Sequence, residues 1–172
     1  IGHVATRPEQ IEVGAVPTNC GVYAPTIRWR DGKFYVIVSV MYSPVGCVVF
    51  SATDPAGPWS DGVAFEGIDG IDPDLAWDED GTAYLTFSGL GVNPALPTFM
   101  SHRGLLQARV DLETGRALEE PRSIWSGVGG QFPEAPHLYR VGDHWYLLIA
   151  EGGTERGHAI SIARGPAPSG PF

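Results

Sequence analysis

Three stretches decide the fold: APTIRWRDGKFYVIVSV from Ala24, DPDLAWDEDGTAYLTFSG from Asp72 and EAPHLYRVGDHWYLLIAEG from Glu134. In each, a Pro is followed ten or eleven residues later by a Tyr, with a Gly-containing turn between the two. Alternating apolar and polar residues around such a turn are typical of a β-hairpin. Because equivalent positions of a repeat point toward one place, we expect Asp72 and Glu134, which precede two of the prolines, to share a site.

The composition indicates a soluble globular all-β domain. The 172 residues are 43% hydrophobic and 18% charged, and the 23 Gly and 15 Pro favour many short strands over helices. A net charge of -9, with eleven scattered Lys and Arg, argues against a nucleic-acid partner. The most apolar stretch, 34–50, is interrupted by Ser, Pro and Gly, so no membrane segment is expected.

The repeat length points to a β-propeller. The prolines that open the copies, Pro25, Pro73 and Pro136, are 48 and 63 residues apart, which fits four-stranded blades with variable loops. We predict blades over about 20–66, 67–130 and 131–172, with 1–19 as a linker that follows a missing first blade. Propellers need about four to eight blades to close. The chain is therefore expected to be a fragment, or one arc completed by another polypeptide, with two uncovered apolar sheet faces through which it could self-associate.

Several other residues receive structural interpretations. Cys20 and Cys47 are expected to be free, packed thiols. The three tryptophans that recur within the repeats are predicted to lie in the core: Trp29, Trp77 and Trp145. The DEDG stretch that begins at Asp78 is predicted to be a hairpin turn, since it lacks the ligand pattern of a calcium loop. No metal site or cofactor motif is identified.

A pair of carboxylates converging at the mouth of a propeller channel is the arrangement that glycoside hydrolysis requires. One protonated acid donates to the leaving oxygen, and a nearby ionised Asp72 would keep Glu134 protonated by raising its pKa. Asp-Pro and Glu-x-Pro also occur simply where strands and turns begin, so the spacing alone leaves a structural role open.

The repeats, together with the segments SATDPAGPWSD and AEGGT followed by GH, resemble glycoside hydrolase family 43, the five-bladed propeller enzymes, and especially its β-xylosidase and arabinofuranosidase branch. The resemblance covers nearly the whole chain. It implies an inverting mechanism with an Asp base, an Asp that tunes the acid, and a Glu acid. Glu134 matches the acid and Asp72 the tuning residue.

The resemblance also implies a substrate-binding set around a xylose- or arabinose-containing oligosaccharide. These positions are Tyr23, Ala24, Ile71, Thr154 and His158. Ile71 stands where many relatives have an aromatic residue, which affects the expected substrate preference. His137 and His158 could contact substrate or support Glu134. Relatives that act on short imported oligosaccharides suggest a cytoplasmic location.

One catalytic group is missing from the resemblance. The family's base lies near the start of the first blade, and no Asp precedes Asp31 here. Asp31 falls in a hairpin turn and is no substitute. The isolated chain is therefore predicted to be inactive.

Two other functions stay open at this point. One is a retaining fructan or sucrose hydrolase, although those enzymes usually have R-D-P and E-C-P where this chain has I-D-P and E-A-P. The other is a non-catalytic propeller arc that binds glycans or a protein.

Overall fold

The computed structural model describes residues 2–11, 21–41, 45–68, 70–93, 96–154 and 156–172. Within these ranges the strands form three antiparallel sheets, which confirms the all-β prediction. The first sheet contains β1 (Val22–Arg30), β2 (Lys33–Val40), β3 (Gly46–Ala52) and β4 (Val63–Phe65). The second contains β5 (Gly70–Trp77), β6 (Ala83–Asn93), β7 (Leu96–Asp111), β8 (Arg116–Ala117) and β9 (Arg122–Trp125). The third contains β10 (Glu134–Val141), β11 (His144–Glu151) and β12 (Ala159–Gly165).

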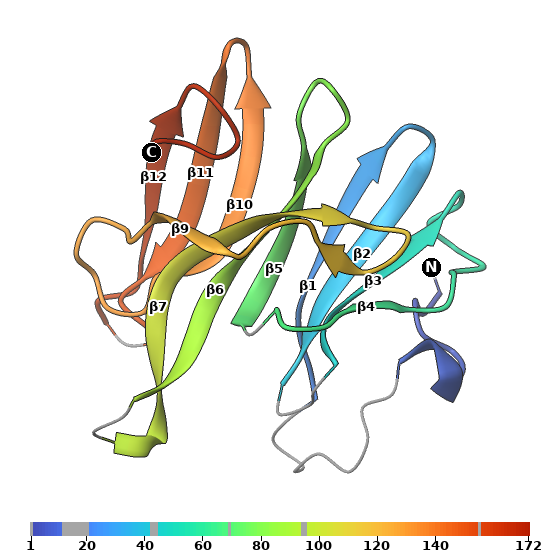
Figure 1. Cartoon of the computed structure of the whole chain (residues 1–172), viewed down its shortest axis with the longest axis horizontal. Helices are drawn as coiled ribbons and strands as arrows, with labels where there is room; N and C mark the ends of the chain where they lie inside the picture. The colour runs from blue at the N-terminus through green and yellow to red at the C-terminus, as the bar shows by residue number, and fades with distance from the viewer. Residues whose placement is uncertain (1, 12–20, 42–44, 69, 94–95, 155) are drawn as a thin grey trace.

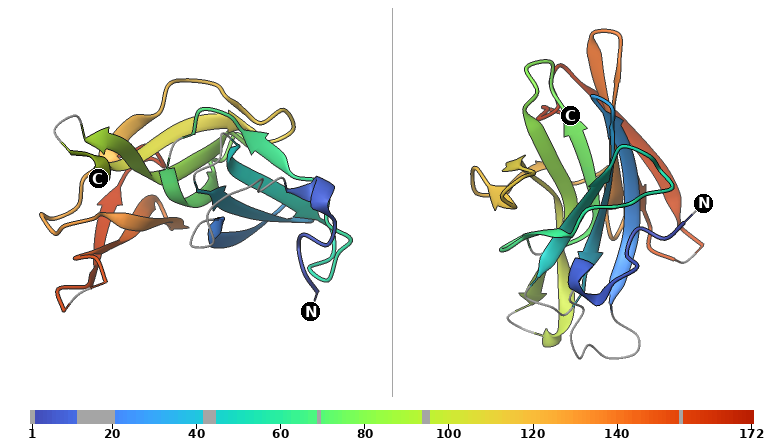
Figure 2. Two further views of the ribbon diagram at one scale, coloured as in Figure 1. Left: turned by 90° about the horizontal axis from the view of Figure 1, so that it is seen from below. Right: turned by 90° about the vertical axis from the view of Figure 1, so that its right-hand side faces the viewer.

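The sheets stand face to face in chain order and spread like a fan, with the two chain ends at opposite sides (Figure 1; Figure 2). Their first strands, β1, β5 and β10, are neighbours along the inner edge of the fan. The sheets have four, five and three strands, where the repeat predicted four in each. The second sheet is larger because β8 and β9 both pair with the long strand β7.

Helical structure is confined to one turn in the described residues, the 3₁₀-helix η1 (Pro8–Gln10). No helix in this part of the chain has the length and apolar character needed to cross a membrane.

Each inner strand begins with the same irregularity. The inner strand has one more residue than its partner strand at this point of the ladder. The irregularity lies between Tyr23 and Thr26 on β1, between Ile71 and Asp74 on β5, and between Glu134 and His137 on β10. These β-bulges contain the repeat prolines, which have no N–H to donate to a ladder. The residue before each proline has a positive φ: 45° for Ala24, 54° for Asp72 and 47° for Ala135. A positive φ is uncommon outside Gly, so three equivalent bulges adopt the same unusual backbone.

Two apolar interfaces join the sheets. Leu75, Leu85 and Phe87 of the second sheet pack against Ile37 and Phe65 of the first. On the other side, Ala76 and Leu105 pack against a cluster from the third sheet that includes Leu138, Trp145, Leu147 and Ile149. The alternating burial of β11 shows why a period-two sequence pattern builds such a layer, since every second side chain faces the neighbouring sheet.

The predicted tryptophan core is right for Trp145 and wrong for Trp29. The Trp145 side chain is buried, and Trp77 is partly buried with its ring 5.2 Å from that of Tyr35. Trp29, by contrast, is 63% exposed, and Ile27 on the same strand is 54% exposed. Ile27 pairs with Val36 and Trp29 pairs with Phe34, on the face of the first sheet that points away from the second sheet. The second sheet therefore does not cover Ile27 and Trp29.

The N-terminal residues 2–11 pack on that same outer face. Val4 and Ile11 contact a cluster that includes Val38, Phe50 and Trp59. The Gln10 amide is buried and holds the segment in place, because its Oε1 accepts from the Thr6 N–H at 2.7 Å and its Nε2 donates to the Ser60 carbonyl at 3.0 Å. This part of the predicted linker is thus docked on the sheet.

The smaller structural predictions have mixed outcomes. Cys47 is a free, buried thiol whose pKa is raised to about 12 by burial, while Cys20 lies outside the described residues. The DEDG stretch forms the predicted turn between β5 and β6. There the Gly81 N–H donates to the Asp78 carbonyl at 3.1 Å and the Thr82 N–H donates to Asp80 Oδ1 at 2.9 Å.

A buried carboxylate connects the three inner strands. Asp74, on β5, has no exposed surface. Its Oδ2 accepts from the backbone N–H of Leu138 on β10 at 2.8 Å, and its Oδ1 lies 2.5 Å from Arg28 Nη2 on β1. Arg28 also donates from Nε to the Leu75 carbonyl at 3.0 Å. One side chain of the middle sheet thereby contacts both of its neighbours.

A second buried carboxylate holds the loop that leads into β10. Glu151, at the end of β11, accepts from the N–H groups of Val128 at 3.1 Å and Gly130 at 3.0 Å. Burial disfavours its charge, but hydrogen bonds from the Ser161 hydroxyl and from the amides of residues 128–130 outweigh burial and lower its pKa. The next residue, Gly152, donates its N–H to the Gln131 carbonyl at 2.6 Å.

We expect Asp74→Ala to destabilise the chain by about 3–5 kcal/mol, because it leaves the Arg28 charge without its partner in a part-buried site. The measurement is the free energy of unfolding from urea titration. Asp31→Asn is the matched control, since it removes the charge of an 83% exposed partner of Arg30 and keeps a residue type that tolerates the positive φ of this turn position, so it should have no measurable effect. Equal losses in the two variants would contradict the role of Asp74.

Glu151→Gln should destabilise the chain by about 1–3 kcal/mol, because an amide cannot accept hydrogen bonds at both former oxygens. The pKa of Glu151 is lowered in the folded state, so its stabilising effect is complete above the ordinary value of 4.5 and is lost as pH falls below it. Urea titrations from pH 7 to pH 3 should show a smaller acid-dependent loss for this variant than for the wild type. Glu113→Gln, at an exposed turn, should keep the wild-type profile.

Candidate functional site

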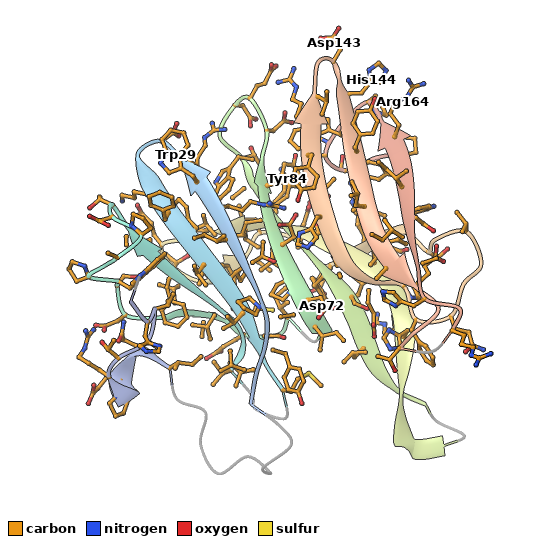
Figure 3. The ribbon with its side chains drawn as sticks, turned by 180° about the vertical axis from the view of Figure 1, so that it is seen from behind. Trp29, Asp72, Tyr84, Asp143, His144 and Arg164 are labelled. Carbon is orange, nitrogen blue, oxygen red and sulfur yellow. The ribbon has the colours of Figure 1, made fainter. Side chains whose placement is uncertain are left out.

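The candidate site lies where the inner strands begin. Figure 3 shows Asp72 at the start of β5, at the end of the sheets opposite to Trp29 and to the hairpin tip with Asp143 and His144. Ala24 and Ala135 occupy the equivalent bulge positions on β1 and β10. Glu134 stands one residue before its bulge position, where β1 has Tyr23 and β5 has Ile71.

Asp72 and Glu134 are brought together through the backbone. Asp72 Oδ2 accepts from the N–H of Ala135 at 3.0 Å, which is the amide directly after Glu134. The carboxylate of Asp72 thus fixes the start of β10 and places its own negative charge beside the Glu134 side chain. Both acidic residues are partly buried.

Both carboxyl groups of the pair are harder to ionise than usual. Burial raises the pKa of Glu134, the negative charge of Asp72 raises it further, and His158 lowers it. Burial likewise raises the pKa of Asp72, and the Ala135 hydrogen bond and the charges of His102 and His137 counteract part of this effect. Two nearby carboxyl groups with raised pKa values suit a site in which one of them donates a proton.

A histidine that sequence analysis missed contacts Glu134. His102 Nε2, on β7, lies 3.3 Å from Glu134 Oε1, and the two side chains are 16% and 28% exposed. Burial lowers the pKa of His102, and the charge of Asp72 opposes this shift. His102 Nδ1 lies 3.3 Å from Ser88 Oγ on β6, and the Ser88 hydroxyl donates to the Pro133 carbonyl at 2.8 Å.

The loop before β10 completes this surrounding. The Phe132 ring packs edge-on against the His102 ring, with 5.0 Å between ring centroids. A Cβ on Gly153 would come within 2.9 Å of the Phe132 ring, so the EGGT segment must have Gly there. Together with the Glu151 hydrogen bonds, this packing attaches the EGGT segment to the loop that precedes Glu134.

The predicted substrate-binding residues are spread around the strand starts. Tyr23 and Ala24 are exposed at the start of β1, and Ile71 is partly buried directly before Asp72. Thr154 is exposed in the turn after β11. His158 follows in the same connection, with Nδ1 2.5 Å from the Gly153 carbonyl, and lies near enough to influence Glu134.

Two residues considered from the sequence have other surroundings. His137 contacts the inner-strand charges, with Nδ1 3.3 Å from Arg28 Nη2 and 3.7 Å from Asp74 Oδ1, and does not support Glu134 directly. Asp31 lies in the turn after β1 and pairs with Arg30. At the rise of an extended strand it is roughly 20 Å from the bulge at Ala24, at the wrong end of the sheet for the site.

The described side chains do not form a set of metal ligands. Across the described ranges, no group of three or more His, Cys, Asp and Glu side chains is arranged to hold a metal ion. What the arrangement offers is proton chemistry from a carboxyl pair and a histidine.

The chain is similar in sequence and fold to several glycosidases. The chain is 37% identical over 175 residues to a non-reducing end α-L-arabinofuranosidase of Bacteroides ovatus, which covers 100% of this chain and 31% of that protein. It is 30% identical over 185 residues to a β-xylosidase of Bacillus subtilis, with 100% and 33% covered. A xylan β-1,4-xylosidase structure from Bacillus halodurans C-125 superposes with a TM-score of 0.85 at 28% identity, over 99% of this chain and 33% of that one.

The chain thus spans about a third of the length of the curated relatives it matches. Its three sheets correspond to part of a family propeller, as the repeat predicted. The model of glycosyl hydrolases family 43 matches residues 1–172, and the chain belongs to that family.

Proposed function

We propose that this chain supplies the acid and its tuning carboxylate to an inverting glycosidase that removes terminal xylose or arabinose from oligosaccharides. The observation that carries the proposal is the Asp72 carboxylate bound to the amide beside Glu134, where its charge raises the pKa of the Glu134 carboxyl. Similarity to an arabinofuranosidase and to β-xylosidases supports the substrate class.

The proposed chemistry assigns unequal roles to the two acids. Glu134 donates its proton to the glycosidic oxygen as the bond to the sugar breaks. Asp72 remains ionised, keeps Glu134 protonated at neutral pH, and holds the start of β10 through the Ala135 amide. Tyr23, Ala24, Ile71, Thr154 and His158 surround the terminal sugar in this proposal.

The base that activates water is proposed to come from residues beyond this chain. Asp31 is remote from the strand starts, so the 172 residues alone are expected to show no turnover. Exposed apolar side chains at the two outer faces, Ile27 and Trp29 on β1 and Ile160 and Ile162 on β12, support covering by further blades or, in the isolated chain, by self-association.

The complete gene product should hydrolyse xylo- or arabino-oligosaccharides with inversion, observed as the first anomer formed in a proton NMR time course. Glu134→Gln should lower kcat/KM on these substrates by about 10²–10⁴, because the leaving sugar needs a proton. The loss should be smaller on aryl glycosides whose leaving groups are acidic and depart without one. Glu66→Gln, at an exposed turn, is the control.

Four outcomes would contradict parts of this proposal. Retention of configuration would indicate a nucleophilic carboxylate. Equal losses on both substrate types would remove the acid role from Glu134, and turnover by the 172-residue chain alone would remove the need for an external base. Binding of xylo-oligosaccharide in calorimetry without turnover of the complete gene product would indicate a glycan-binding protein.

Glu134→Gln should raise the free energy of unfolding of the chain at pH 7. The pKa of Glu134 is raised in the folded state, so ionisation disfavours folding above that value, and the penalty is relieved as pH falls through it. The gain of the variant should therefore shrink on acidification toward the ordinary value of 4.5. Urea titrations at pH 7 and pH 4 measure this, with Glu66→Gln expected to match the wild type at both.

A further inference from the structure

A chain of polar groups leads from the backbone to Glu134. It runs from the Pro133 carbonyl to the Ser88 hydroxyl at 2.8 Å, from Ser88 to His102 Nδ1 at 3.3 Å, and from His102 Nε2 to Glu134 Oε1 at 3.3 Å. Ser88 has no exposed surface, and Pro133 is buried. This chain of contacts gives His102 a fixed orientation.

The direction of each hydrogen bond follows from the groups themselves. A carbonyl oxygen only accepts, so the single hydroxyl proton of Ser88 points to Pro133. Ser88 Oγ can then only accept from His102, which places the ring proton on Nδ1. A neutral imidazole has one ring proton, so Nε2 presents a lone pair to Glu134.

A lone pair facing Glu134 Oε1 is favourable only when that carboxyl carries a proton. In the alternative state, the proton shared by the pair has moved from Glu134 Oε1 to His102 Nε2, so that His102 is a cation beside an ionised Glu134. The surroundings favour the neutral pair, because burial lowers the pKa of His102 while burial and Asp72 raise that of Glu134. Among the described residues, the charged groups that shift the pKa of Glu134 are Asp72 and His158, and the charged group that shifts the pKa of His102 is Asp72.

We propose that His102 is a positioning residue that holds Glu134 in its protonated form, through an Nε2 lone pair oriented by Ser88 and the Pro133 carbonyl. This inference rests on the proposed role of Glu134 as the acid. In the substrate-free site the Glu134 proton lies between Oε1 and Nε2, and the carboxyl turns it toward the glycosidic oxygen when substrate binds. His102 keeps its Nδ1 proton throughout.

The test is NMR of the complete gene product labelled with [¹⁵N]histidine and with ¹³C at the glutamate carboxyl, which needs no turnover. At pH 7, His102 should show a protonated Nδ1 and a bare Nε2. His102→Leu removes the acceptor of the Glu134 proton, so the titration midpoint of Glu134 should fall. A rise would mean that His102 is a cation that pairs with the carboxylate, and would overturn the proposal.

Ser88→Ala gives an independent readout with a small change of volume. Without the hydroxyl, both ring tautomers should become populated, and the Glu134 midpoint should fall as well. An unchanged single tautomer would overturn the proposed orientation by Ser88. His144→Leu, at the exposed tip of the β10–β11 hairpin, should leave the Glu134 midpoint unchanged.

A pH profile separates this proposal from the proposed function. If the gene product is active, His102→Leu should move the basic limb of kcat/KM to lower pH, since that limb reports the acid in the free enzyme. A missing activity in the wild type would reject the glycosidase, while the NMR midpoints would still decide how His102 acts on Glu134.

Discussion

The Asp74 carboxylate, closed off from solvent, joins the three sheets at the edge where they meet. One of its oxygens accepts a hydrogen bond from the Leu138 N–H of the third sheet, and the other faces the Arg28 guanidinium of the first. A charge in that place is unfavourable unless both partners are present. These two contacts favour one relative position of the three inner strands, and apolar side chains of neighbouring sheets pack around them.

Asp72 repeats this device two residues earlier on the same strand. It too binds a backbone amide of β10, and the two carboxylates together connect β5 to β10 at Ala135 and Leu138. The difference lies in exposure, because Asp74 is fully buried and Asp72 reaches the partly open strand starts. The same type of hydrogen bond thus joins the sheets in the buried interior at one position and fixes the residue after Glu134 at the other.

The repeat in the sequence was enough to predict the sheets and the convergence of Asp72 with Glu134, because both depend on local patterns that recur at fixed spacing. The exposure of Trp29 could not be predicted, since the strand pattern shows that a face is apolar but not whether another segment covers it. His102 was missed for a different reason. It lies on β7 outside the repeated stretches, and the pairing of β6 with β7 brings it beside Ser88 and near Glu134.

Each inner strand has the same positive-φ position at its bulge, yet only one of the three positions, Asp72, carries a carboxylate. Ala24, Asp72 and Ala135 share a positive φ, so the energetic cost of that conformation is met by the surrounding sheet, whichever side chain occupies the position. The backbone conformation at these three positions is therefore the same for an alanine and for an aspartate side chain. Within one chain, the same backbone conformation thus carries a carboxylate at one position and a methyl group at two others, which agrees with the general separation of fold from function.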